Sequence, residues 1–252
     1  MSGTDSAGRP WAGRSFEASP WGADDGSAPP GFLAASDAFR AGQVGPEAVV
    51  DALRDARLLV PLLAGLAEAG EGHGGHVLDK KAELALVTVA GPDGRNVLPA
   101  FSSAEAMQRW NPAARPVPAP ARQVALAAAA DGTELVIVDP ASATQFGLRR
   151  PALEALARDL PWLPAPRDPE VARALRSAAA GEDAVTAVRV TTDDPAATLE
   201  GAEVRVVVVL HSLLTQEALS ALLGRLQERW RADPVVQRRV DSLAVGIEAA
   251  LC

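Results

Sequence analysis

The sequence of 252 residues has no tyrosine and a single cysteine, and only 4% of its residues are aromatic. Because that cysteine, Cys252, has no second thiol to join, no intramolecular disulfide forms and no cysteine-based metal site is available. With so few aromatic rings, the buried core must be built mainly from Ala, Val and Leu. The hydrophobic content of 48% is ample for such a core.

Long apolar runs and basic clusters are also missing. No run of about 18 apolar residues is present to cross a bilayer, and the first residues lack the basic and apolar pattern of a secretory signal. Only two of the 24 basic residues are lysines, Lys80 and Lys81, and the formal net charge is −8. No part of the chain has the basic excess that binding to nucleic-acid phosphates requires. We therefore expect a cytoplasmic protein that binds neither membrane nor nucleic acid.

Composition divides the chain into three parts. Residues 1–46 are rich in Gly, Ser, Ala, Pro and Asp, and their aromatic residues follow neither a helical nor an alternating period. Such a segment buries too little surface to offset the entropy of ordering, so we expect a disordered tail. In the alternative, its aromatic side chains dock on a partner or on the folded body. A proline-rich break at 161–166 then separates an α/β domain at 47–165 from a smaller C-terminal α/β domain at 166–252.

The clearest local unit is a β-hairpin at 83–101. An apolar, β-rich run ends at the turn residues Gly91-Pro92-Asp93-Gly94, and a partner strand follows. Ser102 is expected to cap the next helix, while Glu105 reaches back to complete a capping box.

Hydrophobic periodicity and turn residues predict the other elements. In the first domain we expect strands at 57–63, 83–90, 95–101 and 134–139, and helices at 46–55, 103–110, 120–130 and 150–158. The second domain is predicted to be of an αββαβ type, with a helix at 169–180, strands at 184–191 and 203–210, and a helix capped by Thr215. Residues 241–248 fit either a last strand or a helix, and the strand is favoured.

Between Arg57 and Pro164 the chain carries a series of short motifs. They are Leu58-Leu59-Val60-Pro61, Asp79-Lys80-Lys81, Gly91-Pro92-Asp93-Gly94-Arg95, Leu98-Pro99-Ala100-Phe101-Ser102-Ser103, Trp110-Asn111-Pro112, Val138-Asp139-Pro140 and Trp162-Leu163-Pro164. In this order they resemble the SseB family, named for enhanced serine sensitivity, and its actinobacterial branch most closely.

The resemblance implies an SseB-like N-terminal α/β domain. It implies no enzymatic activity, because the family has no catalytic motif to transfer to this chain. Many relatives have Asn where this chain has Asp139, a departure that removes an amide donor.

The side chains that most resemble a metal site are His73, His76 and Asp79, in a Gly-rich loop. Two histidines and a carboxylate could coordinate zinc, but structural zinc sites usually need four ligands, so we expect no metal and no cofactor. Asp139 follows a strand and precedes Pro140, where α/β sheets place ligands, although it is equally a turn residue.

These observations favour a non-catalytic protein-binding or adaptor module with an unidentified protein partner. The expected interaction surface is Arg225, Arg229, Trp230 and Arg231, since Arg and Trp are favoured in interface hot spots. In the alternative interpretation, Trp230 lies in its own core and the helix face is simply solvated.

A second hypothesis is a small-molecule-binding or enzymatic α/β domain. Its site would include one or more of four residues, His73, His76, Asp79 and Asp139. The sequence contains no complete catalytic constellation, so the protein-binding hypothesis is preferred.

Overall fold

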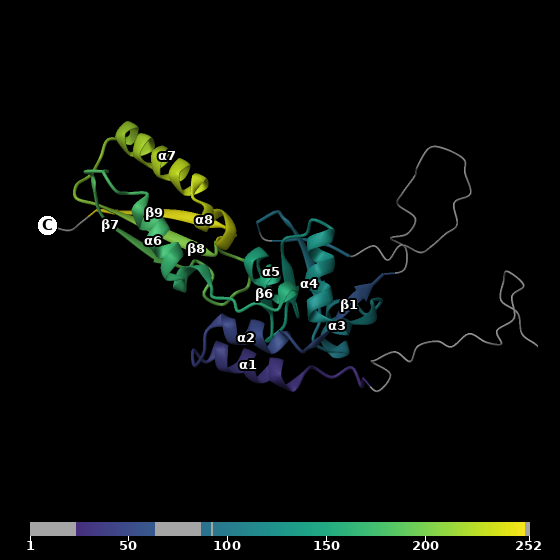
Figure 1. The fold of residues 1–252 in the computed structure, drawn as a ribbon. Coiled ribbons are helices and arrows are strands. Elements are labelled where there is room, and N and C mark those ends of the chain that lie inside the picture. Colours follow the sequence, from purple (N-terminus) through teal and green to yellow (C-terminus); the bar gives the residue numbers. More distant parts are fainter. Residues whose placement is uncertain (1–23, 64–86, 92, 250–252) are drawn as a thin grey trace, which may run out of the picture.

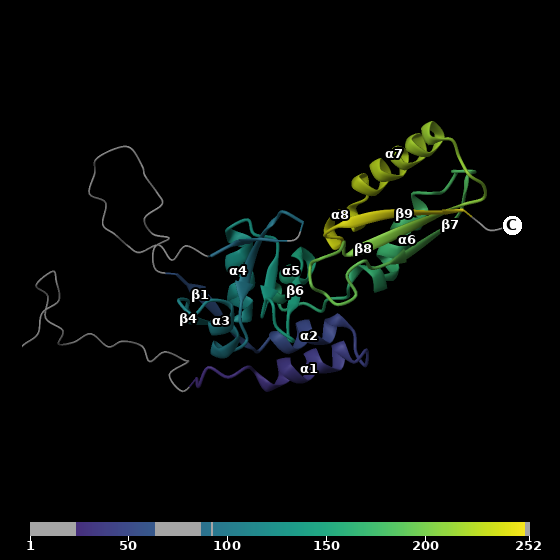
Figure 2. The same ribbon diagram turned by 180° about the vertical axis from the view of Figure 1, so that it is seen from behind.

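The computed structural model describes residues 24–63, 87–91 and 93–249 (Figure 1). The first half of the chain forms one body of helices and strands, and the second half forms another at one end of the molecule (Figures 1 and 2). Each body has its own cluster of buried hydrophobic side chains. Both combine helices with mixed sheets, so the chain is of the α/β class.

A four-stranded sheet lies in the first body, in the order β2-β3-β5-β6. Its strands are β2 (Val89–Ala90), β3 (Asn96–Ala100), β5 (Val136–Val138) and β6 (Phe146–Leu148). β3 and β5 are parallel, and the two outer pairs are antiparallel. β2 and β3 form the predicted hairpin, with Val89 opposite Val97. Residues 83–86 of the predicted first strand lie outside the described residues.

A separate antiparallel ribbon joins β1 (Arg57–Leu62) to β4 (Arg115–Pro120). Leu59 exchanges both backbone hydrogen bonds with Phe101 at the end of β3, so its N–H and C=O point away from β4. Pro118 lies opposite Leu59, so the backbone N and C=O of Pro118 point away from β1, toward the outer edge of β4. The other two prolines of β4 follow the same alternation. They cost the ribbon no hydrogen bond and remove N–H donors from its free edge.

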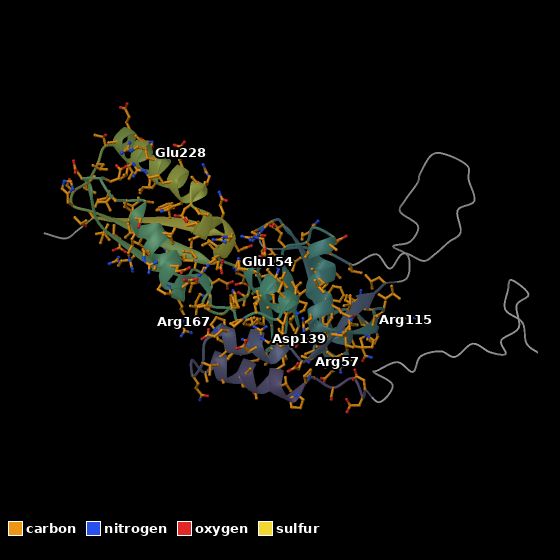
Figure 3. The ribbon with its side chains drawn as sticks, in the orientation of Figure 1. Arg57, Arg115, Asp139, Glu154, Arg167 and Glu228 are labelled. Atoms are coloured by element: carbon orange, nitrogen blue, oxygen red, sulfur yellow. The ribbon has the colours of Figure 1, made fainter. Side chains whose placement is uncertain are left out.

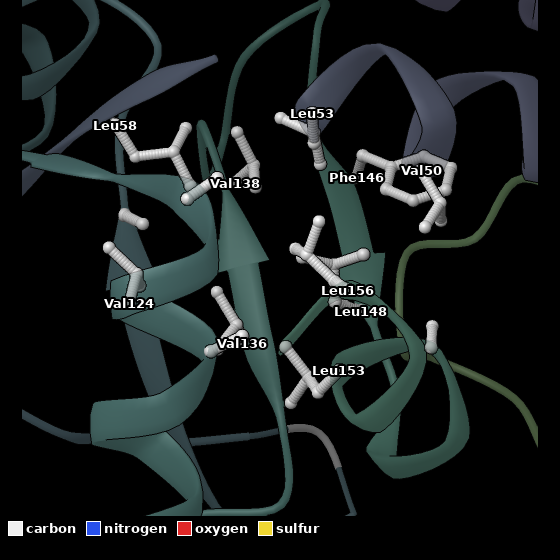
Figure 4. Close-up of a cluster of buried hydrophobic side chains, with 14 of the residues drawn as sticks. Val50, Leu53, Leu58, Val124, Val136, Val138, Phe146, Leu148, Leu153 and Leu156 are labelled. Atoms are coloured by element: carbon white, nitrogen blue, oxygen red, sulfur yellow. The ribbon is translucent and has the colours of Figure 1, made fainter. Parts of the chain in front are cut away.

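Five helices accompany these strands. They are α1 (Pro30–Arg40), α2 (Pro46–Leu53), α3 (Ala104–Trp110), α4 (Ala121–Ala130) and α5 (Arg150–Arg158). In the core, Val124 of α4 and Leu153 and Leu156 of α5 lie beside Val136 and Val138 of β5 (Figure 4). Most of this core is aliphatic, as the scarcity of aromatic residues predicts, but Phe32 and Phe146 also belong to it.

The prediction that residues 1–46 form a disordered tail is wrong for residues 24–46. Phe32 of α1 is fully buried in the first core, and Phe39 packs edge-on against Phe146 with ring centroids 5.7 Å apart. Phe32 and Phe39 are seven residues apart and so share one face of a helix, which is enough apolar area to hold it against the body. Residues 1–23 lie outside the described residues.

The second body is built around a three-stranded sheet in the order β7-β8-β9. Its elements are α6 (Pro169–Ser177), β7 (Val185–Thr191), β8 (Val204–Leu210), α7 (Gln216–Ala232), α8 (Pro234–Arg239) and β9 (Leu243–Ala249). β8 is antiparallel to β7 and parallel to β9. Leu175 of α6 and Leu226 of α7 share one cluster with Val206 and Val208 of β8, so both helices cover the same face of the sheet.

The strand favoured at 241–248 is therefore confirmed as β9. Sequence analysis missed α8, as it missed α1 and β6. A short turn, η2 (Ala165–Arg167), lies where the two bodies meet. Trp162 packs against the first core and Ala165 lies in the second, but the domain boundary at 165 stays a prediction.

Among the residues described, no helix has both the length and the apolar character needed to cross a membrane.

The docking of α1 predicts the effect of shortening its buried aromatic side chain. Phe32→Ala should lower the free energy of unfolding by about 3–5 kcal/mol, because it leaves a cavity in a core that closes only in part. The neighbouring Leu33, which is 36% exposed, gives a matched control, and Leu33→Ala should cost less than about 1 kcal/mol. Urea unfolding measures both values. Equal, small effects of the two substitutions would show that α1 does not pack against the body.

Candidate functional site

Three of the residues singled out by sequence cannot be placed. His73, His76 and Asp79 fall within 64–86, outside the described residues. Elsewhere, in the parts of the chain that the structure does describe, no group of three or more His, Cys, Asp or Glu side chains could hold a metal ion.

Asp139 is fully buried at the end of β5, with a left-handed backbone (φ 51°) (Figure 3). Its Oδ1 accepts the backbone N–H of Ser102 at 2.7 Å, and its Oδ2 accepts the hydroxyls of Ser102 at 2.6 Å and Thr144 at 2.7 Å. Three donors thus converge on one carboxylate and join the ends of β3 and β5 to the loop before β6. This is a structural role. The two hydroxyls can also turn and accept hydrogen bonds, so an amide at this position would find partners as well.

The same contacts correct the predicted helix cap. Ser102 is engaged with Asp139, and it is Ser103 whose hydroxyl accepts the N–H of Ala106, at 3.1 Å, at the start of α3. Both residues are serines at the end of a strand, so only the direction of the side chain distinguishes them.

The structure corrects the expected interaction surface at one of its residues, Trp230. Trp230 is only 2% exposed, lies in the second core, and donates its Nε1–H to the carbonyl of Leu175 at 3.0 Å. Arg225 and Arg229 both form ion pairs with Glu182. Trp230 is therefore core, because every third or fourth residue of α7 turns toward the sheet. Among the three arginines of the expected surface, Arg231 alone is exposed without an ion pair to any residue that the structure describes.

The outer edge of β9 is a candidate interaction site that sequence analysis did not identify. The N–H of Val204 donates to the carbonyl of Ser242, which fixes the alternation along β9. The backbone N–H and C=O groups of Leu243, Val245 and Ile247 consequently point away from β8, along the free edge. This edge has N–H donors at all three positions, and Glu248 is the one charged residue of the strand.

A groove of about 330 Å³ runs beside this edge, between β9 and helices α7 and α8. Its walls include Leu243, Val245 and Val236, and Trp230 and Arg231 of α7 also line it. Because β-strand side chains alternate between faces, Leu243, Val245 and Ile247 all lie on the face that the helices cover. The arrangement combines unused backbone donors and acceptors, apolar side-chain sites and one cation.

A second set of polar residues lies where the two bodies meet. The Arg149 guanidinium, at the start of α5, donates to Asp194 at 2.6 Å and to Asp241 at 3.2 Å, and all three side chains are buried. Arg95, after the hairpin turn, donates two hydrogen bonds to the same carboxylate, to Oδ1 of Asp241 at 3.0 Å and to Oδ2 at 2.8 Å. Burial raises the pKa of Asp241, but the hydrogen bonds and charges of Arg95 and Arg149 outweigh it, and the net pKa is lowered.

Glu203 is the buried carboxyl beside this set. Its Oε2 accepts the backbone N–H of Asp241 at 2.6 Å, whereas its Oε1 has no hydrogen-bond partner among the described residues. Burial raises its pKa to about 7, and the Asp241 hydrogen bond opposes that shift only in part. Neither the motifs nor the spacing in the sequence signals this cluster, because its members come from four separate segments.

The raised pKa of Glu203 predicts how stability depends on pH. Between about pH 4.5 and 7 the folded protein keeps a proton on Glu203 that the unfolded chain has lost, so the stability that this proton provides is present in full below pH 4.5. This contribution to the free energy of unfolding, on the order of 3 kcal/mol in all, is lost as the pH rises through 7. Glu203→Gln should remove most of that slope in urea unfolding between pH 5 and 8. The exposed Glu228 (Figure 3) is the control, and Glu228→Gln should leave the slope as in the wild type. The same slope in both variants would contradict the assignment.

The comparisons with known proteins agree with the first body and are silent on the second. The family model for the SseB protein N-terminal domain matches residues 32–155. This match begins inside α1 and ends inside α5, so the family domain starts earlier than the predicted residue 47 and includes most of α1. A comparison with curated proteins finds no match, and neither does one with solved structures. Residues 32–155 of the chain thus form an SseB protein N-terminal domain.

Proposed function

We propose that this SseB-family chain is a non-catalytic, cytoplasmic protein-binding module that holds an extended segment of a partner protein along the free edge of β9. The observation that carries the proposal is the set of outward backbone groups on Leu243, Val245 and Ile247, beside a groove that is lined by both apolar and polar side chains. An added strand would satisfy these groups through main-chain hydrogen bonds, and its alternate side chains would enter the groove.

The treatment of other edges in the same chain supports this proposal. β4 carries prolines at its outward positions, and the N–H of Gly147 in the edge strand β6 donates to the carbonyl of Ala197. β7 has a register irregularity between Val185 and Ala187. Exposed edges are normally protected in such ways because they pair readily with other chains. β9 has none of these protections among the described residues.

The chemistry of the groove indicates the kind of segment that fits. Leu243, Val245 and Val236 favour apolar side chains at alternate positions of the bound strand. Arg231 is exposed at the groove and has no carboxylate partner among the described residues. We therefore expect a segment that alternates apolar residues and carries Asp or Glu where it passes Arg231.

The test removes one outward N–H while leaving the β8–β9 ladder in place. Ile247→Pro does this at a position whose side chain is 38% exposed, so the fold should persist, as circular dichroism and the melting temperature will show. Ile247→Val is the matched control, because it keeps the N–H and the β-branched shape. A partner recovered with the wild-type chain should bind the Val variant equally and the Pro variant at least tenfold more weakly, as measured by calorimetry. Arg231→Glu should also weaken binding.

Hydrogen exchange gives a second readout at the same site. The amides of Leu243, Val245 and Ile247 should exchange readily in the free protein and at least tenfold more slowly in the complex. Equal binding by the Pro and Val variants would overturn the proposal. So would a stable dimer of the chain that Ile247→Pro dissociates, because a second copy would then occupy the edge.

A further inference from the structure

An arginine on the second sheet reaches the free edge of β9. Because strand positions alternate between the two faces, Arg205 of β8 and Gly246 of β9 lie on the face opposite to the one that α6 and α7 cover. The Arg205 side chain is 46% exposed, and its Nη1 donates to Oδ1 of Asp193 at 2.7 Å. Its Nε and Nη2 donate to no residue that the structure describes.

These two nitrogens point over Gly246. A Cβ added to Gly246 would lie 3.3 Å from Nη2 and 3.4 Å from Nε of Arg205, and the next atom is Cγ2 of Val207 at 3.6 Å. The Cζ carbon between the two nitrogens is therefore farther away than either, so the guanidinium presents its N–H side, and not its flat face, to this point. Glycine within a strand often marks a place where a ligand or another backbone approaches closely. Glu248, the next residue of β9 on this face, is paired with Arg189 of β7.

Arginines of this chain hold two carboxylates elsewhere. Arg239 pairs with Asp168 at 2.7 Å and with Glu170 at 2.6 Å. Arg205 pairs with Asp193 alone among the described residues. A guanidinium has five N–H donors in a planar fork, and two of them match the two oxygens of a carboxylate. Arg205 can therefore hold a second carboxylate, on the side that faces β9.

We propose that Nε and Nη2 of Arg205 bind the carboxylate of an Asp or Glu in the partner segment, at the position opposite Gly246. This inference rests on the proposed strand addition at β9 and names a further feature of the bound segment. In an antiparallel added strand the outward groups of Val245 and Ile247 make the hydrogen bonds. The residue opposite Gly246 then forms a non-hydrogen-bonded pair, with Cα atoms only about 4.5 Å apart. Its side chain lies on the face of Arg205, and no side chain of Gly246 separates the two.

This contact and the one expected at Arg231 lie on opposite faces of the bound strand. Arg231 lines the groove on the face that the helices cover, whereas Arg205 lies on the other face. Because side chains alternate along a strand, the positions of the two acidic residues in the segment differ by an odd number. The two arginines together thus select the register of the segment, since a slip by one residue exchanges its faces.

The test uses two blocked peptides, acetyl-Ser-Val-Thr-Val-Glu-Val-Thr-Val-Ser-amide and the same peptide with Gln in place of Glu. Their valines can enter the groove while the central residue faces Arg205. In calorimetry at low salt, the full wild-type chain should bind the Glu peptide about fivefold more tightly, the upper range for a half-exposed ion pair. Added salt should reduce this preference.

Three variants locate the source of the preference. Arg205→Gln should bind both peptides equally. Arg225→Gln is the matched control and should keep the preference, because Arg225 is also half-exposed, pairs with Glu182 and does not line the groove. Gly246→Ala places a Cβ against the guanidinium and should reduce the preference, although the melting temperature should stay the same or rise.

Equal binding of the two peptides by the wild-type chain would overturn this inference, and so would the absence of binding by both. A preference for Glu that persists in Arg205→Gln, or that is lost in Arg225→Gln, would overturn it as well. Ile247→Pro separates it from the strand addition. If the peptides bind equally and both bind at least tenfold more weakly to Ile247→Pro, the strand addition stands without the Arg205 contact. If the preference for Glu and the affinity both survive in Ile247→Pro, the strand addition is what fails.

Discussion

The buried guanidinium of Arg149 is the interaction on which the joining of the two bodies depends. It belongs to the first body, at the residue before α5, and its partners Asp194, Gly201, Asp241 and Ser242 all belong to the second. A buried charge must keep nearly all of its hydrogen bonds, because water cannot replace them. The β7–β8 loop and the start of β9 are thereby held at fixed positions against the first body. Arg150 adds hydrogen bonds to the carbonyl of Gln237 in α8 and to that of Val240 just after it.

This constraint also positions β9 and the residues at the junction of the two bodies. Asp241 and Ser242 are held by Arg149 immediately before β9, so the strand starts at a defined point and its free edge faces outward beside α7. The same loop contacts bring Asp194 and Glu203 to the junction, where these two residues and Trp162 line a cavity of about 200 Å³. The edge and the cavity are thus two separate consequences of one packing arrangement.

Local rules of sequence were sufficient for much of the fold. Strands β3, β5, β8 and β9, helices α4 to α7 and the hairpin follow from alternation, periodicity and turn residues, which depend on neighbours in the chain. The local rules gave wrong predictions where a long-range contact decides the position of a helix or a side chain. α1 has weak local signals, and it is held by Phe32 in a core made by residues far along the chain. Trp230 was expected at the surface, yet the carbonyl of Leu175, on another helix, takes its N–H.

The candidate sites depended still more on long-range contacts. The sequence by itself determined that the chain is an α/β protein with an SseB-like first half, few aromatic residues and one cysteine, since composition and ordered motifs are local properties. It also determined which β9 residues keep an N–H, because that requires only the absence of proline. Only the tertiary structure decided that this edge has no neighbour among the described residues, that Asp139 is a buried structural carboxylate, and that Glu203 and Trp162 line one cavity. Those properties arise from residues that are distant in the chain and meet only in the folded structure.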